Sequence, residues 1–258
     1  IVDHPDVRRM LLETRAAIDA MRALCYENAR ALDLALHGED DAARREGQAL
    51  ADLLTPLSKS WCTDLGVELT STALQVLGGM GYVEETGVAQ HLRDARIAPI
   101  YEGTNGIQAI DLVMRKLPSD AGATIDALLD GLVPDPLPEP LDDLAAPLAA
   151  ARDAAQDATR ALRERGERPL DALAGADAYL RLLSTVLATG LVVRGVAAAH
   201  VAAADGSASA PTPELLAART VRARVLVTRL LPAVHGLAPV VVAGADDLYA
   251  LSPAAAGI

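Results

Sequence analysis

The first helix of this protein can be read directly from residues 5–37, PDVRRMLLETRAAIDAMRALCYENARALDLALH. Pro suits a first helical turn, and an acidic residue beside it suits the positive end of the helix dipole. Apolar residues then recur every three or four positions. They are Val7, Met10, Leu11, Ile18, Met21, Leu24, Cys25, Leu32, Ala35 and Leu36. This spacing predicts one amphipathic helix that spans roughly 45 Å at 1.5 Å per residue.

The composition extends this prediction to the whole chain. Of the 258 residues, 51% are hydrophobic but only 2% are aromatic, and Phe is absent. Sheets favour aromatic and β-branched residues, whereas Ala, Leu, Arg and Glu favour helices. We therefore expect an all-α protein, either one large domain or two small ones.

Charge and hydropathy exclude several classes of partner. The chain has 23 Lys and Arg against 35 Asp and Glu, a net charge of -12, so it has no basic surface for nucleic acid. Its most apolar stretch, Val186 to Ala204, is interrupted by Arg194 and His200, so we expect no membrane span. Two cysteines, Cys25 and Cys62, are too few for a disulfide framework. Reduced, buried thiols and a cytoplasmic location are expected.

The pattern along the chain suggests three parts. Residues 1–117 read as a helical bundle, residues 118–147 as an acidic, Pro-rich linker without Lys or Arg, and residues 148–258 as a helical extension. Within the bundle, Pro56 should kink or divide the second helical stretch, which begins near Asp40. Three further helical patterns follow the linker, so we expect a second group of about three antiparallel helices. These patterns cover residues 148–165, 170–204 and 212–231.

One segment carries a signal for anion binding. Residues 75–82 read Gln-Val-Leu-Gly-Gly-Met-Gly-Tyr, with three glycines within four positions. Such glycines leave backbone N–H groups to which a pyrophosphate can come close. An ordinary glycine-rich helix stop is the alternative interpretation. The five scattered histidines form no ligand pattern, and we predict no metal site.

A second segment, about twenty residues further on, carries the best candidate for a catalytic base. Residues 101–108 read Tyr-Glu-Gly-Thr-Asn-Gly-Ile-Gln, so that Glu102 lies between an apolar approach and a glycine turn. A carboxylate with apolar neighbours suits general base chemistry, and a solvated surface Glu is the alternative. Asn105 with Gln108 further predicts a capping box at the start of the next helix.

The two segments, their order and their separation resemble the C-terminal helical domain of acyl-CoA dehydrogenases. These flavoenzymes insert an α,β double bond into acyl-CoA thioesters. The resemblance is close over residues 5–117. Residues 105–112 and the helical extension further resemble the enlarged branch of that family, which includes methylmercaptopropionyl-CoA dehydrogenases and some mycobacterial long-chain enzymes.

The resemblance implies a role for each residue of the two segments. Glu102 would be the base that removes the α-proton, with Tyr101 and Gly103 beside the substrate. Contacts to FAD are implied for two groups, the second of them reaching the cofactor of a neighbouring subunit. The first group is Thr104, Asn105 and Gly106, and the second is Gln75, Val76, Leu77, Gly78 and Gly79.

The same resemblance implies acyl-CoA as substrate, a dimer or tetramer, and an electron-transfer flavoprotein as redox partner. It also implies an amino-terminal helical domain and a middle β-domain, neither of which precedes Ile1. We therefore expect residues 1–258 to be part of a larger enzyme, inactive alone and binding FAD weakly or not at all. Two alternatives remain, a non-enzymatic helical interaction module and an acyl-CoA oxidase.

Overall fold

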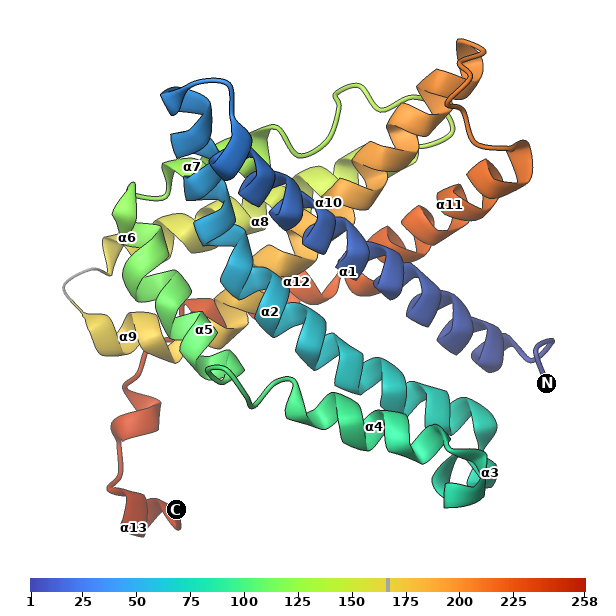
Figure 1. The fold of residues 1–258 in the computed structure, drawn as a ribbon. Helices are drawn as coiled ribbons and strands as arrows, with labels where there is room; N and C mark the ends of the chain where they lie inside the picture. Colours follow the sequence, from blue (N-terminus) through green and yellow to red (C-terminus); the bar gives the residue numbers. More distant parts are fainter. Residues whose placement is uncertain (166–167) are drawn as a thin grey trace.

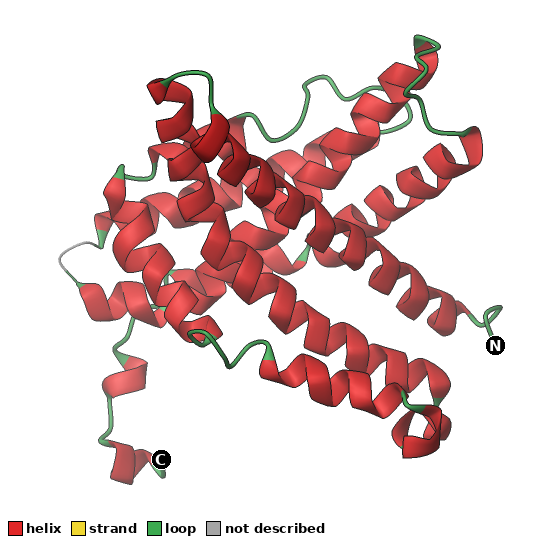
Figure 2. Ribbon diagram, viewed as in Figure 1, coloured by secondary structure: helices red, strands yellow, loops and turns green. Residues whose placement is uncertain are grey.

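The computed structural model describes residues 1–165 and 168–258, and every regular element within those ranges is helical (Figure 2). The predicted all-α class is therefore confirmed. The first part of the chain forms α1 (Pro5–His37), α2 (Asp41–Leu77), α3 (Gly79–Tyr82), the 3-10 turn η1 (Glu84–Thr86), α4 (Val88–Ile97), α5 (Asn105–Asp111) and the π-helical turn η2 (Leu112–Lys116).

The second part continues from η2 without a break. It forms α6 (Leu117–Ser119), α7 (Ala123–Asp130), the 3-10 turn η3 (Asp142–Leu144), α8 (Ala145–Glu164), α9 (Pro169–Ala174), α10 (Ala176–Ala204), α11 (Pro213–Val225), the π-helical turn η4 (Leu226–Leu230), α12 (Ala233–Val241), the 3-10 turn η5 (Asp247–Tyr249) and α13 (Pro253–Ala256).

The helices α1 and α2 form a long hairpin, and α3, α4 and α5 pack against α2 (Figure 1). Near the turn the two helices come very close, because a Cβ on Gly47 would lie 2.4 Å from the backbone nitrogen of Ala35. Of the two effects predicted for Pro56, a kink or a division of the second helix, the division is wrong, since α2 continues through Pro56 to Leu77. Pro56 is buried, and packing in the core outweighs the backbone hydrogen bond that a proline removes.

Residues 118–147 pack into the core, although their composition resembles that of a linker. They include α7, and their apolar side chains are buried with those of the helices on both sides. These side chains are Ile125, Leu129, Leu132, Leu137, Leu141 and Leu144. Leu132 reaches α10 so closely that a Cβ on Gly190 would lie 2.3 Å from its Cγ. Bundle, segment 118–147 and extension thus share one apolar core, while the domain boundaries stay a prediction.

Helix α10 lies at the centre of that core and contacts α1, α2, α5, α8, α11 and α12. Within the described residues α10 is long and apolar enough to cross a membrane, and α11 to α12 would meet the same test as one span bent by 41°. However, 67% of the most apolar window of α10 is buried by the protein itself. Core helices of this kind have the same length and composition.

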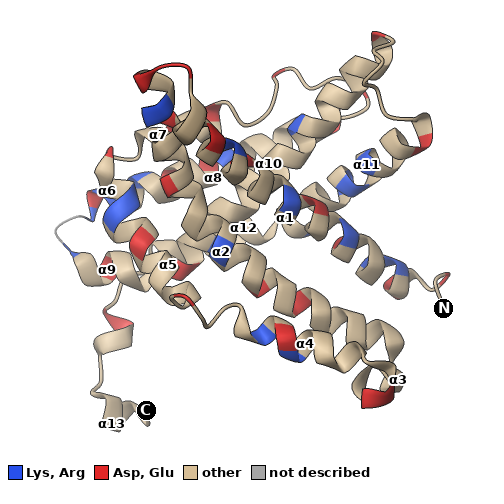
Figure 3. Cartoon of the chain, in the orientation of Figure 1, with Lys and Arg blue, Asp and Glu red and all other residues tan. Residues whose placement is uncertain are grey.

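Charged contacts also join the extension to the bundle. Figure 3 shows Lys and Arg in blue and Asp and Glu in red, interspersed along the helices. Arg194 of α10 lies 3.2 Å from Glu27 of α1, and Arg222 of α11 pairs with Asp19 of α1. The extension also binds segment 118–147, where Arg224 of α11 donates to both carboxylate oxygens of Asp143, at 2.6 and 2.8 Å, and lowers the pKa of Asp143.

Candidate functional site

A buried asparagine holds the loop between α4 and α5. Asn105 is 7% exposed, and its backbone N–H donates to Pro99 O at 3.0 Å. Its side-chain Nδ2 lies 2.7 Å from Asp64 Oδ1 and 3.1 Å from Ser60 O, both on α2. Asn105 therefore fastens the loop that contains Glu102 to the long second helix.

Lys59 completes this attachment from the same face of α2. Its Nζ donates to Asn105 Oδ1 at 2.7 Å and to the carbonyl of Gly103 at 2.9 Å. Burial lowers the pKa of Lys59, and the nearby carboxylates of Asp64 and Glu102 oppose this shift. The ammonium group thus contacts the turn that follows Glu102, at the carbonyl of Gly103.

Sequence reasoning missed the α2 side of this network. The residues are Lys59, Ser60, Thr63 and Asp64. A signal for them was present, because these polar residues repeat at intervals of four in an otherwise apolar part of the helix. The predicted capping box is also wrong, since Thr104 is the N-cap and its Oγ1 accepts from Ile107 N–H at 3.4 Å.

The backbone at Glu102 has an unusual conformation. Its φ is 52°, and the φ of Gly103 is 83°, so two consecutive residues are left-handed. For a residue with a Cβ this conformation costs about 1 kcal/mol, and such strain occurs preferentially at functional sites. Among the described residues the Glu102 N–H has no hydrogen-bond acceptor. Both Glu102 and its neighbour Tyr101 are exposed.

The glycine-rich segment forms a tight turn at the end of α2. Gly78 has a φ of 60°, and its N–H donates to Gln75 O at 3.1 Å. Gly81 packs on α2, where a Cβ would lie 2.4 Å from Leu74 O. Gly79, in contrast, has no heavy atom within 4 Å of its Cβ position. The turn therefore has one glycine that packing requires and another with open space around it.

Within one chain, the structure does not bring the two predicted cofactor groups together. Residues 75–79 precede α4, and residues 101–106 follow it, so the groups lie at opposite ends of this helix (Figure 1). Helix α4 has 10 residues and is about 15 Å long. Large apolar side chains are exposed near both ends, namely Leu77, Met80, Tyr82, Ile97, Ile100, Tyr101 and Ile107.

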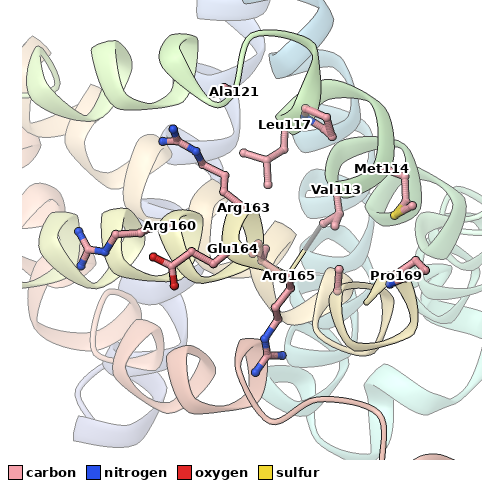
Figure 4. Close-up of a pocket in the computed structure, with 12 residues that line it drawn as sticks. Val113, Met114, Leu117, Ala121, Arg160, Arg163, Glu164, Arg165 and Pro169 are labelled. Atoms are coloured by element: carbon pink, nitrogen blue, oxygen red, sulfur yellow. The ribbon is translucent and has the colours of Figure 1, made fainter. Parts of the chain in front are cut away.

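A separate cavity of about 630 Å³ lies between η2 and α6 on one side and α8 and α9 on the other. Figure 4 shows Val113, Met114 and Leu117 on one wall and Arg163 of α8 opposite. None of the predicted site residues lines this cavity, so it does not define the candidate site. In the part of the chain that the structure describes, no three His, Cys, Asp or Glu residues are grouped so that they could hold a metal ion.

Two family models match the chain, and together they cover most of it. The model described as "Acyl-CoA dehydrogenase, C-terminal domain" matches residues 1–117. The model described as "Acetyl-CoA dehydrogenase C-terminal like" matches residues 120–252.

Two relatives match about half of the chain. A 3-methylmercaptopropionyl-CoA dehydrogenase of Ruegeria pomeroyi is 55% identical over 48% of this chain and 21% of its own length. The broad-specificity linear acyl-CoA dehydrogenase FadE5 of Mycobacterium tuberculosis is 35% identical, again over 48% of this chain and 21% of its own length. The matched part thus spans about a fifth of each relative.

Solved structures share the fold over nearly the whole chain. The Caenorhabditis elegans protein ACDH-11, crystallised with C11-CoA, has a TM-score of 0.69 at 20% identity over 89% of this chain and 37% of its own. An acyl-CoA dehydrogenase of Bacillus anthracis, complexed with FAD, has a TM-score of 0.64 at 16% identity over 93% of this chain and 42% of its own. Together with the two family models, these relatives confirm the resemblance seen in the sequence, and the chain belongs to the acyl-CoA dehydrogenase family, whose C-terminal domains it contains.

Proposed function

We propose that residues 1–258 form the C-terminal part of a flavin-dependent enzyme that oxidises acyl-CoA thioesters to trans-2-enoyl-CoA. Glu102 is the base that removes the α-proton. The observation that carries this proposal is the left-handed turn at Glu102 and Gly103, which Lys59 and Asn105 tie to α2. A strained turn with this much support keeps one carboxylate at a fixed place on the surface.

The backbone of Glu102 serves a second purpose in this proposal. An α-proton of a thioester is too weakly acidic for a carboxylate unless the developing enolate is stabilised. The Glu102 N–H, which has no acceptor among the described residues, donates to the thioester carbonyl oxygen and supplies part of that stabilisation. Tyr101 and Gly103 flank the same position and contact the acyl chain.

The residues present suit a flavin. The backbone of Gly78 and Gly79 is open, with no heavy atom within 4 Å of either Cβ position, so a pyrophosphate can approach it. Gln75, Val76 and Leu77 lead into this turn. At the other end of the cofactor Thr104 and Gly106 would contact it, while Asn105, whose side chain is bound to α2, would hold them in place. When bound, FAD accepts the hydride from the β-carbon of the substrate. The redox partner in this proposal would be an electron-transfer flavoprotein.

The resemblance to the family implies self-association, and the placement of the two cofactor groups is compatible with it. The two cofactor groups lie at opposite ends of α4, so each flavin would contact residues 101–106 of one subunit and residues 75–79 of another. We propose a dimer or tetramer on this ground. We also propose that residues 1–258 alone are inactive and bind FAD weakly, because Glu102 and Tyr101 are exposed in the single chain.

The test is Glu102→Gln in the flavin-loaded enzyme that contains this chain. Substrate should no longer reduce the bound flavin, while the flavin content stays near that of wild type. Glu39→Gln, an exposed residue between α1 and α2, is the matched control and should leave reduction intact. Appreciable flavin reduction by the Glu102 variant would refute the role of this residue.

The electron acceptor distinguishes the dehydrogenase from an oxidase. Stoichiometric peroxide from the reduced enzyme in air would identify an oxidase, and transfer to an electron-transfer flavoprotein would identify a dehydrogenase. If residues 1–258 alone purified with about one flavin per chain, the proposal of weak binding would fail.

A further inference from the structure

The fold brings the two cysteines of the chain together. Cys25 lies on α1 and Cys62 on α2, 37 positions apart in sequence, yet their Sγ atoms are 3.9 Å apart. The helices that carry them run side by side over most of their length (Figure 1). A disulfide requires an S–S distance near 2.05 Å, so a side-chain adjustment of about 2 Å would join them.

The two thiols differ in exposure, and the sequence-based expectation that both are buried is wrong. Cys25 is exposed, whereas Cys62 is partly buried and packs against the core beside Met21. The Sγ of Cys62 is also 3.9 Å from the carbonyl oxygen of Met21. An oxidant in solution therefore reaches Cys25 first.

The pKa values of the two thiols differ in a way that also favours Cys25 as the reactive one. A hydrogen bond from the thiol of Cys62 lowers the pKa of Cys25 to about 7, against the opposing effect of burial. The same contact and burial raise the pKa of Cys62. Because the thiolate is the nucleophile, Cys25 is the reactive cysteine of the pair and Cys62 is the resolving cysteine.

We propose that Cys25 and Cys62 form a reversible redox site, which hydrogen peroxide or another hydroperoxide oxidises to a disulfide between α1 and α2. In the first step the Cys25 thiolate attacks one peroxide oxygen, the O–O bond breaks, and a Cys25 sulfenic acid and hydroxide form. In the second step Cys62 attacks the Cys25 sulfur, the S–O bond breaks, and water leaves. A dithiol reductant supplies the two electrons that restore both thiols.

The position of the pair gives the disulfide a structural consequence. Cys62 lies three residues after Lys59, on the part of α2 that holds the Glu102 turn. A covalent bond there fixes the middle of α1 to this part of α2. It closes a loop of 38 residues, so the oxidised chain should unfold at a temperature roughly 5–10 °C higher.

The experiment treats reduced residues 1–258 with a small excess of hydrogen peroxide, then quenches and analyses the chain. We expect both titratable thiols to disappear, the mass of the monomer to fall by two hydrogen atoms, and dithiothreitol to reverse both changes. In urea the disulfide should form at least about ten-fold more slowly, because the thiols are no longer held together.

Single variants separate the two roles. Cys62→Ser should stop at a Cys25 sulfenic acid that dimedone traps, whereas Cys25→Ser should consume peroxide much more slowly. Disulfide-linked dimers in place of the monomeric product, or a Cys25 sulfinic acid with Cys62 still reduced, would overturn the proposal. None of these measurements requires flavin or acyl-CoA. Their outcome therefore tests the redox site independently of the proposed function.

Discussion

Lys59 on α2 donates its ammonium proton to Asn105 Oδ1 at 2.7 Å, although the two residues are 46 positions apart in the sequence. The same Nζ binds the carbonyl oxygen of Gly103. This contact joins the longest helix of the bundle to the turn that contains Glu102. The candidate site is therefore held in place by Lys59, a residue that belongs to neither predicted segment.

Replacing Lys59 should weaken this support. Lys59→Met leaves Asn105 Oδ1 and the Gly103 carbonyl without their charged donor, and we expect a loss of about 2 kcal/mol in the free energy of unfolding. Lys59→Arg keeps a charged donor and should recover part of the lost unfolding free energy. Urea unfolding of the two variants measures the difference. Equal stability of wild type and both variants would show that the contact adds nothing.

Gly81 should be the glycine of the 78–81 turn that the fold cannot replace. A Cβ there would lie 2.4 Å from Leu74 O, so Gly81→Ala should displace α3 and cost about 2 kcal/mol or more. Gly79→Ala is the matched control, because the space around Gly79 is open and its stability should change by less than about 0.5 kcal/mol. Thermal unfolding distinguishes them, and similar costs for the two would contradict the packing.

Leu141 tests whether residues 118–147 contribute to the core. Its side chain is fully buried, so Leu141→Ala should destabilise the chain by about 3 kcal/mol. Leu170→Ala, at a position that is 52% exposed, should cost less than about 0.5 kcal/mol. Chemical unfolding followed by circular dichroism gives both values. A cost for Leu141 no greater than that for Leu170 would mean that the segment packs only loosely.

Cys25 should titrate near neutral pH. Its pKa falls from the ordinary 9.0 to about 7, so its alkylation by iodoacetamide should rise with a midpoint near pH 7. Cys62→Ala removes the hydrogen bond that lowers this pKa and should move the midpoint upward. A midpoint near 9 in the wild type would contradict the assignment.

The same shift makes the stability of the folded chain depend on pH. A thiol whose pKa is lower in the folded chain than in the unfolded chain favours folding once it is ionised. The contribution is complete above about pH 9 and is lost as the pH falls through about 7. The difference in unfolding free energy between wild type and Cys25→Ser should therefore grow over this interval. A difference that stays constant would mean that Cys25 has the same pKa in both states.

Local pattern was enough for the helical class, for α1 and for the resemblance to the family. The apolar spacing of residues 5–37 predicted α1 because side chains three and four apart lie on one face of a helix, whatever surrounds it. The order and separation of residues 75–82 and 101–108 likewise indicated the acyl-CoA dehydrogenase family from the sequence alone. Proline was a poor guide in two places, since Pro56 lies inside α2 and the Pro-rich segment 118–147 packs into the core. In both, burial of apolar surface outweighs local propensity.

By itself, then, the sequence determined the helical class and the position of α1, and its resemblance to a known family indicated Glu102 as the candidate base. Only the tertiary structure placed Lys59 beneath the turn of Gly103 and Asn105, and Cys62 beside Cys25. Helical periodicity depends on neighbours a few positions away, whereas these contacts join residues 37 to 46 positions apart. Such contacts exist only after α1, α2 and the loop before α5 have packed together, because that packing sets which faces of the helices meet.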